Sequence, residues 1–566
     1  MGIATTRPLE RVLAATGQID EAPVMFEAQS SLCQAGVLFA LPALISQGLF
    51  EYENIYKPLP KGYYGFRSIV LTLAIMALCR IKNPEQLKQC KVGELGRIIG
   101  LDRLPETRNL RTKIQHIVTQ QKAVEFNKHL LNRWLDKEEC IYFYIDGHVR
   151  IYYGSQGQLT SKYVSRQKLC LSATTEYWVN DNNGLPYLVV NGELNEKLQD
   201  IIETEIVPRL LASDFIQSRQ QQNEEVLFTL VFDREAYKPA FFYRLWVEHK
   251  IAVITYRKNV RDLWDKNSFK PYCIEVIGNQ VDMLLCEQPI TLDGCPFREV
   301  RSLSEGGHQT AIMTTHPRIT INQIAGQMFS RWSQENFFKY MIADYDFDKM
   351  AEFGTESIDE NKEVVNPEYR KITYRIKKLK EKAGRLEAEF YTLVEELNNK
   401  TIDKLPAFTP RQLGYMEQIQ NLKETINQLT GERRQIPARI QLKNMPEGKR
   451  YNKLKTESKL FLNLIKMICY RAETVIAEQL NPFFSKAKEE KRMLIKQIFN
   501  TTADLIPDYV NLTLTVRLYS LSTPRANEAA EKLCTLLNDT ETVFPGTNLQ
   551  LIFKTTASQI ARDQEV

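Results

Sequence analysis

The chain has 566 residues, of which 43% are hydrophobic and 25% are charged. This is the composition of folded globular proteins, and at roughly 150 residues per domain the length predicts three to four domains. The 74 basic residues outnumber the 69 acidic residues by only five, which excludes a polycation of the histone type. Any nucleic-acid surface must therefore be formed by local clustering of charge.

Several classes of protein are not expected. The longest apolar run, Ser68 to Cys79, has about 12 residues, whereas a membrane span needs about 20. The first residues lack the basic start and apolar stretch of a signal peptide. No GxxxxGK[ST] or GxGxxG motif occurs, so no nucleotide cofactor is expected. We therefore expect a cytoplasmic protein that does not bind membranes.

The cysteines and histidines do not form metal-binding patterns. The ten cysteines run from Cys33 to Cys534 without a CxxC pair, which is typical of reduced intracellular thiols. The six histidines never occur at the HxxxH or HxxH spacing, so a structural zinc site is not expected. Any catalysis must then depend on other groups.

Residues 1–25 are expected to form a flexible arm, followed by a helical DNA-binding region over 26–135. Within this region a short helix, Val92 to Ile99, is followed by Gly100 and by a second helix that begins at Pro105. A helix, a glycine turn and a basic helix are the pattern of a helix-turn-helix, whose second helix enters the major groove. Two packed helices that do not touch DNA would show the same pattern. The predicted DNA contacts on the second helix are Arg108, Arg111 and Lys113.

From residue 140 to 345 the pattern predicts a mixed α/β domain, because β-branched and aromatic residues recur with period two. A first strand, Cys140 to Ile145, is expected to end at Asp146. A turn at Gly147 and a second strand, Val149 to Tyr153, are expected to follow.

Further strands and helices complete this domain. A fourth strand, Val226 to Phe232, is expected to end at Asp233, and a fifth follows at Ile251 to Tyr256. A β-rich insertion, 258–316, then separates the sheet from a final helix, Ile321 to Ile342.

The segment 367–432 is predicted to be a coiled-coil helical hairpin. Apolar residues keep a 4-3 spacing over nearly four heptads, and a shorter seam follows a proline-containing loop. Pairing with another protomer is the alternative. The two seams consist of Ile372, Ile376, Leu379, Ala383, Leu386, Phe390, Leu393 and Leu397, then Ile419, Leu422, Ile426 and Leu429.

A basic helical region, 433–505, and a small α/β cap, 506–560, are expected to complete the chain. Arg433 to Lys459 contains nine basic and two acidic residues, an excess larger than that of the whole chain. Most charge runs are solvated helix faces. A surface that faces phosphates is favoured here because the excess is almost unopposed.

Three acids stand out by their positions. If the first and fourth strands are neighbours, Asp146 and Asp233 lie side by side at one edge of the sheet. Glu335 continues the inward stripe of the final helix, and an inward acid must be paired or bound to a metal. An all-oxygen cluster suits Mg²⁺ or Mn²⁺, and two such ions stabilise the attacking and leaving oxygens of phosphoryl transfer. The stripe consists of Ile321, Ile324, Ala325, Met328 and Trp332.

Each acid also has a simpler interpretation. Asp146 would bond its own backbone in a turn, and Asp233 would cap the following helix. Glu335 would pair with Arg331 or Lys339 along the helix. The joint placement of the three acids favours the metal site.

With these acids in this order, residues 140–342 resemble the DDE transposases of bacterial insertion sequences, which have a ribonuclease-H-like catalytic domain. The likeness is to the group with a β-rich insertion before the final helix. FDREAY around Asp233 is similar to the Asp-Arg block of these enzymes, and Arg331 and Glu335 fit the Arg-x3-Glu core of their Tyr-Arg-Glu-Lys signature. Met328 and Ile342 stand where the signature has Tyr and Lys, and Lys339 is expected to take the phosphate-binding role.

The resemblance implies that Asp146, Asp233 and Glu335 bind two Mg²⁺ (or Mn²⁺) ions. The ions activate water to hydrolyse the phosphodiester at a transposon end, and the freed 3′-hydroxyl then attacks target DNA. Trp332 would stack on an unpaired base, although its place on the inward stripe favours the core. The residues expected to contact DNA phosphates, for which surface solubility is the alternative, are Arg331, Lys339, Arg234, Lys238, Arg257 and Lys258.

The resulting prediction is a multidomain α+β protein: a ribonuclease-H-like mixed sheet flanked by a helical N-terminal region and a coiled-coil-containing helical C-terminal region. It would act on transposon-end and target DNA as a homodimer in the bacterial cytoplasm, associated with the nucleoid. Two other functions stay open. One is a domesticated, transposase-derived protein that binds DNA without cutting it. The other is a coiled-coil architectural protein whose α/β domain is scaffold.

Overall fold

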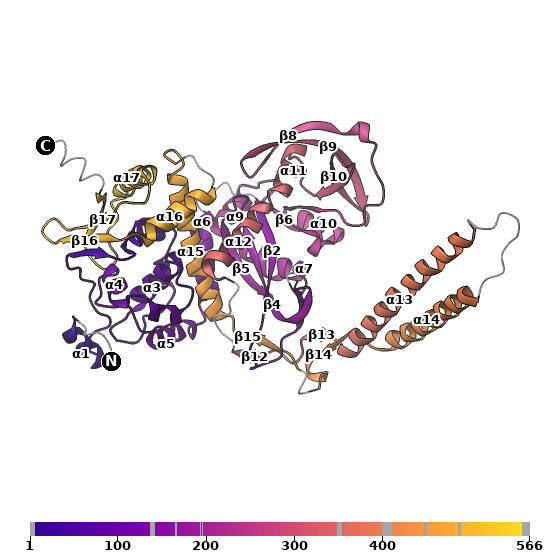
Figure 1. Ribbon diagram of the computed structural model, residues 1–566, viewed down its shortest axis with the longest axis horizontal. Helices are drawn as coiled ribbons and strands as arrows, with labels where there is room; N and C mark the ends of the chain where they lie inside the picture. The colour runs from indigo at the N-terminus through magenta and orange to yellow at the C-terminus, as the bar shows by residue number, and fades with distance from the viewer. Residues whose placement is uncertain are drawn as a thin grey trace. The chain divides into compact units, whose positions relative to one another are not determined.

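The computed structural model of the chain describes residues 6–135, 142–164, 167–192, 194, 196–347, 354–398, 410–446, 450–484 and 488–556 (Figure 1). The chain folds into two compact units. The first unit contains Met1–Tyr152, Ala173–Phe353 and Lys455–Val566, and the second contains Tyr153–Ser172 and Gly354–Leu454. Helices and strands occur in both, so the predicted multidomain α+β class is confirmed.

A mixed sheet forms the centre of the first unit. β2 (Tyr142–Ile151) lies between β4 (Leu169–Asn180), to which it is antiparallel, and β6 (Phe228–Phe232), to which it is parallel. β5 (Pro186–Gly192) pairs with β4, and β7 (Ile251–Tyr256) runs parallel to β6. All five residues of β6 are buried, because a central parallel strand is covered on both faces.

The predicted β-rich insertion continues this sheet. β8 (Lys270–Val276), β9 (Asn279–Leu292) and β10 (Cys295–Leu303) form an antiparallel meander, and β11 (Gln309–Thr314) pairs with both β10 and β7. The turn from β9 to β10 has positive φ at both Asp293 and Gly294, as a type I′ turn requires. The insertion therefore lengthens the sheet by hydrogen bonding at its β7 side.

Helices cover both faces of the central strands. α11 (Ile321–Phe329) packs its buried Ile324 and Met328 with Tyr144 and Val231. The opposite face is covered in part by α10 (Pro239–His249), where Phe242 contacts Phe232 with ring centroids 5.5 Å apart. The other elements between β5 and β7 are α7 (Leu198–Ile201), the π-helix η4 (Ile202–Ile206), α8 (Val207–Leu211), α9 (Asp214–Gln221) and η5 (Arg234–Ala236).

The predicted final helix is two helices. α11 ends at Phe329, and α12 (Trp332–Tyr345) begins after a break at Ser330 and Arg331. The expected single helix from Ile321 to Ile342 is therefore wrong. Helical periodicity did not indicate the break, because no glycine or proline marks it.

The N-terminal and C-terminal segments of the first unit fold together. β1 (Gln29–Leu32) pairs with β16 (Ala503–Asp508), which continues through β17 (Thr513–Leu518) to β18 (Gln550–Thr555), and α17 (Pro524–Asn538) connects the last two strands. The expected C-terminal cap thus includes a strand from the beginning of the chain. The other N-terminal elements are α1 (Pro8–Ala15), η1 (Ala35–Ala40), α2 (Leu41–Ser46), η2 (Glu51–Asn54), α3 (Phe66–Leu78), η3 (Pro84–Gln89), α4 (Val92–Ile98), α5 (Thr107–Val118) and α6 (Ala123–Leu135).

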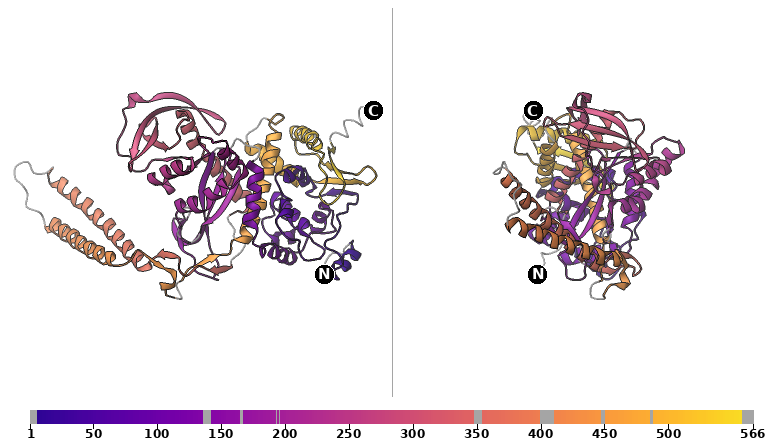
Figure 2. Two further views of the ribbon diagram at one scale, coloured as in Figure 1. Left: turned by 180° about the vertical axis from the view of Figure 1, so that it is seen from behind. Right: turned by 90° about the vertical axis from the view of Figure 1, so that its right-hand side faces the viewer.

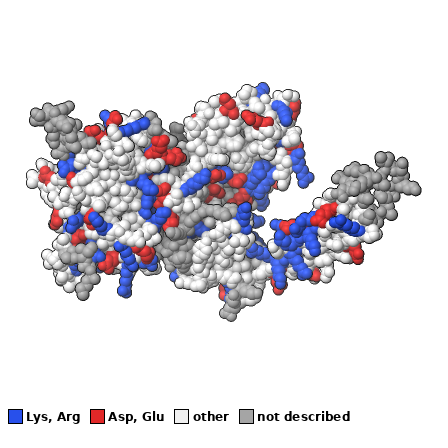
Figure 3. All heavy atoms as spheres, viewed as in Figure 1, with Lys and Arg blue, Asp and Glu red and all other residues white. Residues whose placement is uncertain are grey.

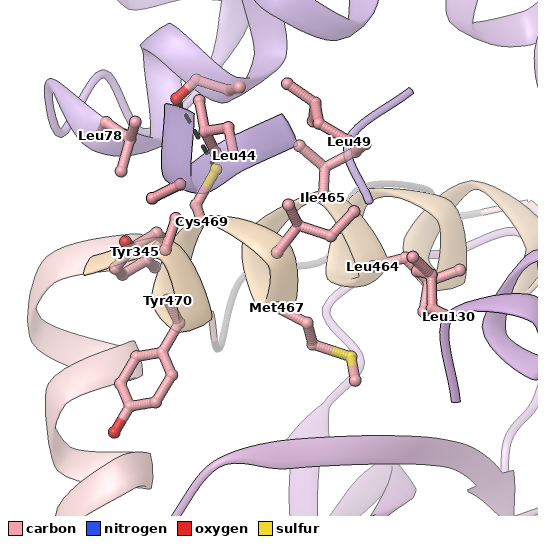
Figure 4. Close-up of a cluster of buried hydrophobic side chains, with 14 of the residues drawn as sticks. Leu44, Leu49, Leu78, Leu130, Tyr345, Leu464, Ile465, Met467, Cys469 and Tyr470 are labelled. Atoms are coloured by element: carbon pink, nitrogen blue, oxygen red, sulfur yellow. Dashed lines mark hydrogen bonds between the residues drawn. The ribbon is translucent and has the colours of Figure 1, made fainter. Parts of the chain in front are cut away.

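One helix of the predicted basic region lies in the core. α15 (Glu457–Gln479) carries Ile465, Met467 and Cys469 into a cluster that includes Leu44 and Leu78 (Figure 4). α16 (Lys488–Asn500) follows it. α15 is therefore a buried part of the first unit, because its apolar residues surround the helix on most sides.

The expected flexible arm contains an ordered helix. In α1, Arg11 forms an ion pair with Asp102, at 2.6 Å between Nη2 and Oδ1.

One stretch of the N-terminal region, Ala35–Asn54, is long and apolar enough to cross a membrane by length and composition alone. About 72% of its most apolar window is buried inside the protein, as in the core helix of a soluble protein.

The second unit is built around a helical hairpin. α13 (Pro367–Asn398) and α14 (Pro410–Gln435) run side by side (Figures 1 and 2). Lys423 pairs with Glu387 at 2.8 Å, and the helices are antiparallel. The shared apolar cluster consists of Ile376, Ile426 and Leu429 with Ile372 and Leu379.

Short strands complete the second unit at the base of the hairpin, whose two helices pack against each other within one chain. The strands pair as β12 (Thr355–Ser357) with β15 (Asn452–Leu454), β13 (Glu363–Val365) with β14 (Arg439–Gln441), and β3 (Ser161–Val164) with the first residues of β4; the 3-10 helix η7 (Leu442–Asn444) follows β14.

Candidate active site

The strands that carry the two aspartates are neighbours. β2 and β6 are parallel, with Ile145 opposite Phe232, so Asp146 and Asp233 follow at the same level on adjacent strands. The condition on which the side-by-side placement of the two aspartates depended is therefore met. Parallel strands put equivalent side chains at the same edge of a sheet.

Asp146 does not end its strand. β2 continues to Ile151, with Asp146 opposite Trp178 of β4, so the predicted turn at Gly147 is wrong. A Cβ at Gly147 would lie 3.0 Å from the ring of Tyr177. Glycine therefore lets the Tyr177 ring lie close to the β2 backbone inside the sheet, and it does not form a turn here.

Asp146 is surrounded by protein and lies near charged groups of both signs. Burial raises the pKa of its carboxyl from 3.8 to about 6; Asp233 and Glu235 add to the rise, and the Arg331 guanidinium opposes it. The backbone N–H of Gly147 donates to Oδ1 at 2.9 Å. A raised carboxyl pKa beside further carboxylates is typical of sites that receive a cation.

Asp233 is exposed and begins η5. Its Oδ1 accepts a hydrogen bond of 2.7 Å from the backbone N–H of Arg234. The helix-capping interpretation of Asp233 is thus realised. Capping uses one oxygen lone pair, so the carboxylate keeps further capacity as a ligand.

Arg331 connects Glu335 with Asp146. Its Nη2 lies 3.2 Å from Oε1 of Glu335, one turn further along α12. Its charge also opposes the rise in the pKa of Asp146, which places it near both carboxylates. Nε of Arg331 is buried and has no hydrogen-bond partner among the described residues. The site therefore contains one donor that is available to an anionic group.

Tyr256, at the end of β7, is a member of this site that the sequence analysis missed. Burial raises the pKa of its hydroxyl, Asp233 and Glu335 add to the rise, and Arg331 opposes it. The hydroxyl therefore lies within electrostatic reach of both acids. Its position at the end of the fifth strand, next to the Asp233 strand, was the available signal.

A second missed residue, Gln334, fastens α12 to the sheet. Its side chain is fully buried, and Nε2 lies 3.2 Å from the carbonyl oxygen of Tyr144 and 3.0 Å from that of Trp178. The same nitrogen lies 2.9 Å from Oδ1 of Asn180. These bonds fix the first turn of α12, which carries Glu335. Gln334 follows the buried Ser333, and buried polar residues leave no apolar periodic signal in the sequence.

The helix break changes the exposure of the predicted stripe. Met328 is fully buried, whereas Trp332 is 58% exposed. The prediction that Trp332 belongs to the core is wrong, because α12 begins anew at this residue and turns it outward. Glu335 is about one third exposed. It therefore faces the surface and is not part of the core stripe.

An ion network holds the other half of α12. Glu473 of α15 is buried, and its Oε1 lies 2.7 Å from Nη2 of Arg80. Its Oε2 lies 3.1 Å from Nη1 of Arg492 and accepts a 2.9 Å hydrogen bond from the Tyr340 hydroxyl. Arg80 also pairs with Asp344 at 3.1 Å. One carboxylate thus joins α3, α12, α15 and α16.

The predicted DNA contacts on α5 have different surroundings. Arg108 is exposed, and Arg111 is exposed but pairs with Glu85 at 2.5 Å. Lys113 is buried, and its Nζ donates to the carbonyl oxygen of Pro60 at 3.0 Å. The prediction that Lys113 contacts DNA is wrong, because it lies on the packed side of α5.

Lys113→Met is expected to leave DNA affinity unchanged and to lower the free energy of unfolding by about 1–2 kcal/mol, because the Pro60 oxygen loses its donor. Arg108→Ala, on the exposed side of the same helix, is the comparison. Fluorescence anisotropy with transposon-end DNA and urea unfolding measure the two effects. An equal loss of affinity in both variants would contradict this placement.

The basic residues near the sheet that were predicted to contact phosphates differ in the partners that they already have. Arg257 is engaged in an ion pair with the buried Glu299 and is not free for DNA. Arg234 lies over the ring of Tyr256, at 5.5 Å from the centroid, and Lys258 lies 5.8 Å from the centroid of Tyr237. Lys238 and Lys339 are exposed.

The donor set suits a hard cation by its chemistry, but the geometry is incomplete. Carboxylate oxygens are the ligands that Mg²⁺ and Mn²⁺ prefer. Within the described part of the chain, however, no three His, Cys, Asp or Glu side chains lie close enough together to hold a metal ion. Asp146 and Asp233 are adjacent, whereas Glu335 is turned to Arg331.

The chain was compared with known proteins. The family described as "Transposase protein" matches residues 2–557. No curated protein matches the chain. A piggyBac transposase synaptic complex with hairpin DNA is similar over 84% of this chain and 83% of that one, with 12% identity and a TM-score of 0.27. Marinitoga piezophila Argonaute, in complex with guide RNA and target DNA, is similar over 37% and 31%, with 11% identity and a TM-score of 0.18.

The family match decides the assignment. It extends over the helical N-terminal region, the mixed sheet, the hairpin and the C-terminal strands. The predicted resemblance to a transposase is thereby confirmed at the level of the family. The chain belongs to the Transposase protein family.

Proposed function

We propose that the chain is a DNA transposase of the DDE type that cleaves transposon-end phosphodiesters and transfers the 3′-hydroxyl to target DNA. Asp146, Asp233 and Glu335 are the catalytic carboxylates of this proposal. The observation that carries it is the position of Asp146 and Asp233 on adjacent parallel strands, where acidic neighbours help to raise the pKa of Asp146. Arg331, whose charge acts on Asp146, also forms an ion pair with Glu335.

The chain's own residues have distinct tasks. Arg331 stabilises the ionised form of Asp146 and pairs with Glu335, and its unpartnered Nε is the donor for a phosphate oxygen. Exposed Lys339 and Lys238 add phosphate contacts that position the DNA without reading its sequence. Exposed Trp332 offers a flat surface for an unpaired base.

Two Mg²⁺ or Mn²⁺ ions remain part of the proposal; when bound, they supply a nucleophilic water and stabilise the leaving oxygen. Because the described carboxylates do not converge as a group of three, we place their assembly in the DNA complex. A homodimer on DNA, action within a bacterial insertion sequence and a cytoplasmic location associated with the nucleoid belong to the same proposal.

The decisive experiment is cleavage of linear DNA that carries the sequences flanking the gene, with and without Mg²⁺ or Mn²⁺. Asp233→Asn and Glu335→Gln are each expected to lower cleavage at least about 100-fold, because transition-state charge loses its stabilisation. Asp293→Asn, in an exposed turn, and Glu248→Gln, on the exposed side of α10, are the matched controls and should cleave normally.

The second function, DNA binding without cleavage, is favoured by the lack of three convergent metal ligands among the described residues. Tight, salt-sensitive binding without breaks under either metal would support it. Metal-dependent breaks at fixed positions that persist in both active-site variants would instead assign the chemistry to other residues.

A further inference from the structure

The charges on α13 are segregated along the helix. Between residues 370 and 385 there are eight basic residues and one acid, whereas residues 386–397 contain four acids and no base. A surface that serves only solubility intersperses the two signs. The basic residues are Arg370, Lys371, Arg375, Lys377, Lys378, Lys380, Lys382 and Arg385.

These side chains are exposed and mostly without a countercharge. Glu381, the single acid, pairs with Lys378 at 2.9 Å and with Lys377 at 3.9 Å. The hydrogen bond from Lys378 lowers the pKa of Glu381, and the charges of Lys377 and Arg385 lower it further. The other six basic residues of this stretch form no ion pair with any residue that the structure describes.

The packing of the hairpin holds the basic residues outward. Ile372, Ile376 and Leu379 take the inner side of α13 against α14, so the charged side chains occupy the solvent side. Figure 3 shows Lys and Arg gathered on this part of the hairpin. At the same end α14 adds Arg433, whose guanidinium lies 5.8 Å from the centroid of Tyr369, and exposed Arg434.

The dimensions suit the phosphate backbone of a duplex. Residues 370–385 span about 22 Å at 1.5 Å per residue, which equals roughly six base pairs at 3.4 Å each. The stretch contains no Asn or Gln, the side chains that read adenine in the major groove. Lys and Arg alone contact phosphates without selecting a sequence.

We infer that the basic face of α13, residues 370–385, is a sequence-independent binding surface for the phosphate backbone of duplex DNA. Its role in holding target DNA rests on the proposed transposase function, whereas binding to the duplex itself does not. The surface lies in the second unit and includes only the start of the basic run Arg433 to Lys459, whose last residue, Lys459, is buried and donates to the carbonyl oxygen of Phe347.

The test uses the full chain and a random-sequence DNA duplex. A triple variant, Lys371→Gln, Arg375→Gln and Lys382→Gln, is compared with the wild type over a series of salt concentrations. We expect the Kd to rise at least about tenfold and the slope of log K against log salt to fall by about 2 to 3, because three phosphate contacts are lost. Gln has nearly the helix propensity of Lys and Arg, so α13 is retained, and far-UV circular dichroism verifies this.

The matched control neutralises three exposed lysines elsewhere: Lys128→Gln, Lys270→Gln and Lys532→Gln. It should keep the wild-type slope. An unchanged slope in the α13 variant would overturn the inference. The inference would also be overturned if the α13 variant lost the ability to bind anionic lipid vesicles while it bound DNA as the wild type does.

Cleavage of transposon-end DNA separates this inference from the proposed function. If the wild type cleaves DNA and the α13 variant keeps the wild-type salt slope, the inference alone fails. If the slope falls as expected but the wild type cleaves nothing under either metal, the proposed function alone fails.

Discussion

Asp146→Asn is expected to abolish DNA cleavage without lowering the stability of the fold. Burial raises the pKa of this carboxyl to about 6 in the folded protein, from an ordinary value of 3.8. The folded state therefore binds the proton more tightly than the unfolded state. Stability from this group is present at low pH and is lost as pH rises from about 4 through 6. The neutral amide avoids that loss.

The measurement is urea unfolding of wild type and variant between pH 4 and pH 8. The free energy of unfolding of Asp146→Asn should exceed that of the wild type by about 3 kcal/mol at pH 7 and by much less at pH 4. Asp293→Asn, in the exposed β9–β10 turn, should show no such pH-dependent difference. A variant that is less stable than wild type at pH 7 would contradict the assigned environment.

Glu473→Gln is expected to lower the free energy of unfolding by about 3–5 kcal/mol. Its carboxylate is buried between the guanidinium groups of Arg80 and Arg492, so neutralising it leaves two buried cations without their common partner. The Tyr340 hydroxyl also loses a charged acceptor. Because Tyr340 belongs to α12, cleavage per folded molecule should decline as well.

Equilibrium unfolding in urea measures the stability change, and cleavage at a temperature where the variant is folded measures the effect on α12. Glu489→Gln, on the exposed first turn of α16, is the control and should change stability by less than about 0.5 kcal/mol. A similarly small change for Glu473→Gln would show that the network does not hold these helices together.

The elements that the sequence predicted well are those with strong local patterns. The buried run Val226 to Phe232 contains β6, and the 4-3 spacing from Ile372 onward corresponds to α13. The adjacency of the Asp146 and Asp233 strands, which the sequence analysis stated only as a condition, is present in the sheet, and mixed sheets have few ways to connect.

The errors arise where distant partners decide the structure. β2 continues past Asp146 because β4 supplies a ladder of partners along its whole length. Lys113 turns inward because the Pro60 carbonyl oxygen, more than fifty residues away, accepts a hydrogen bond from its ammonium group. The helix break before Trp332 carries no glycine or proline. None of these partners is visible in a local window of sequence.

The sheet that joins β1 to β16, β17 and β18 makes the order of synthesis matter. A nascent chain exposes Gln29–Leu32 long before its pairing partner, Ala503–Asp508, has left the ribosome. The helices around α3 likewise lack part of their hydrophobic core until α15 has been synthesised. In a chain that terminates before residue 503, the N-terminal region therefore cannot complete its fold. Only complete translation yields this part of the protein.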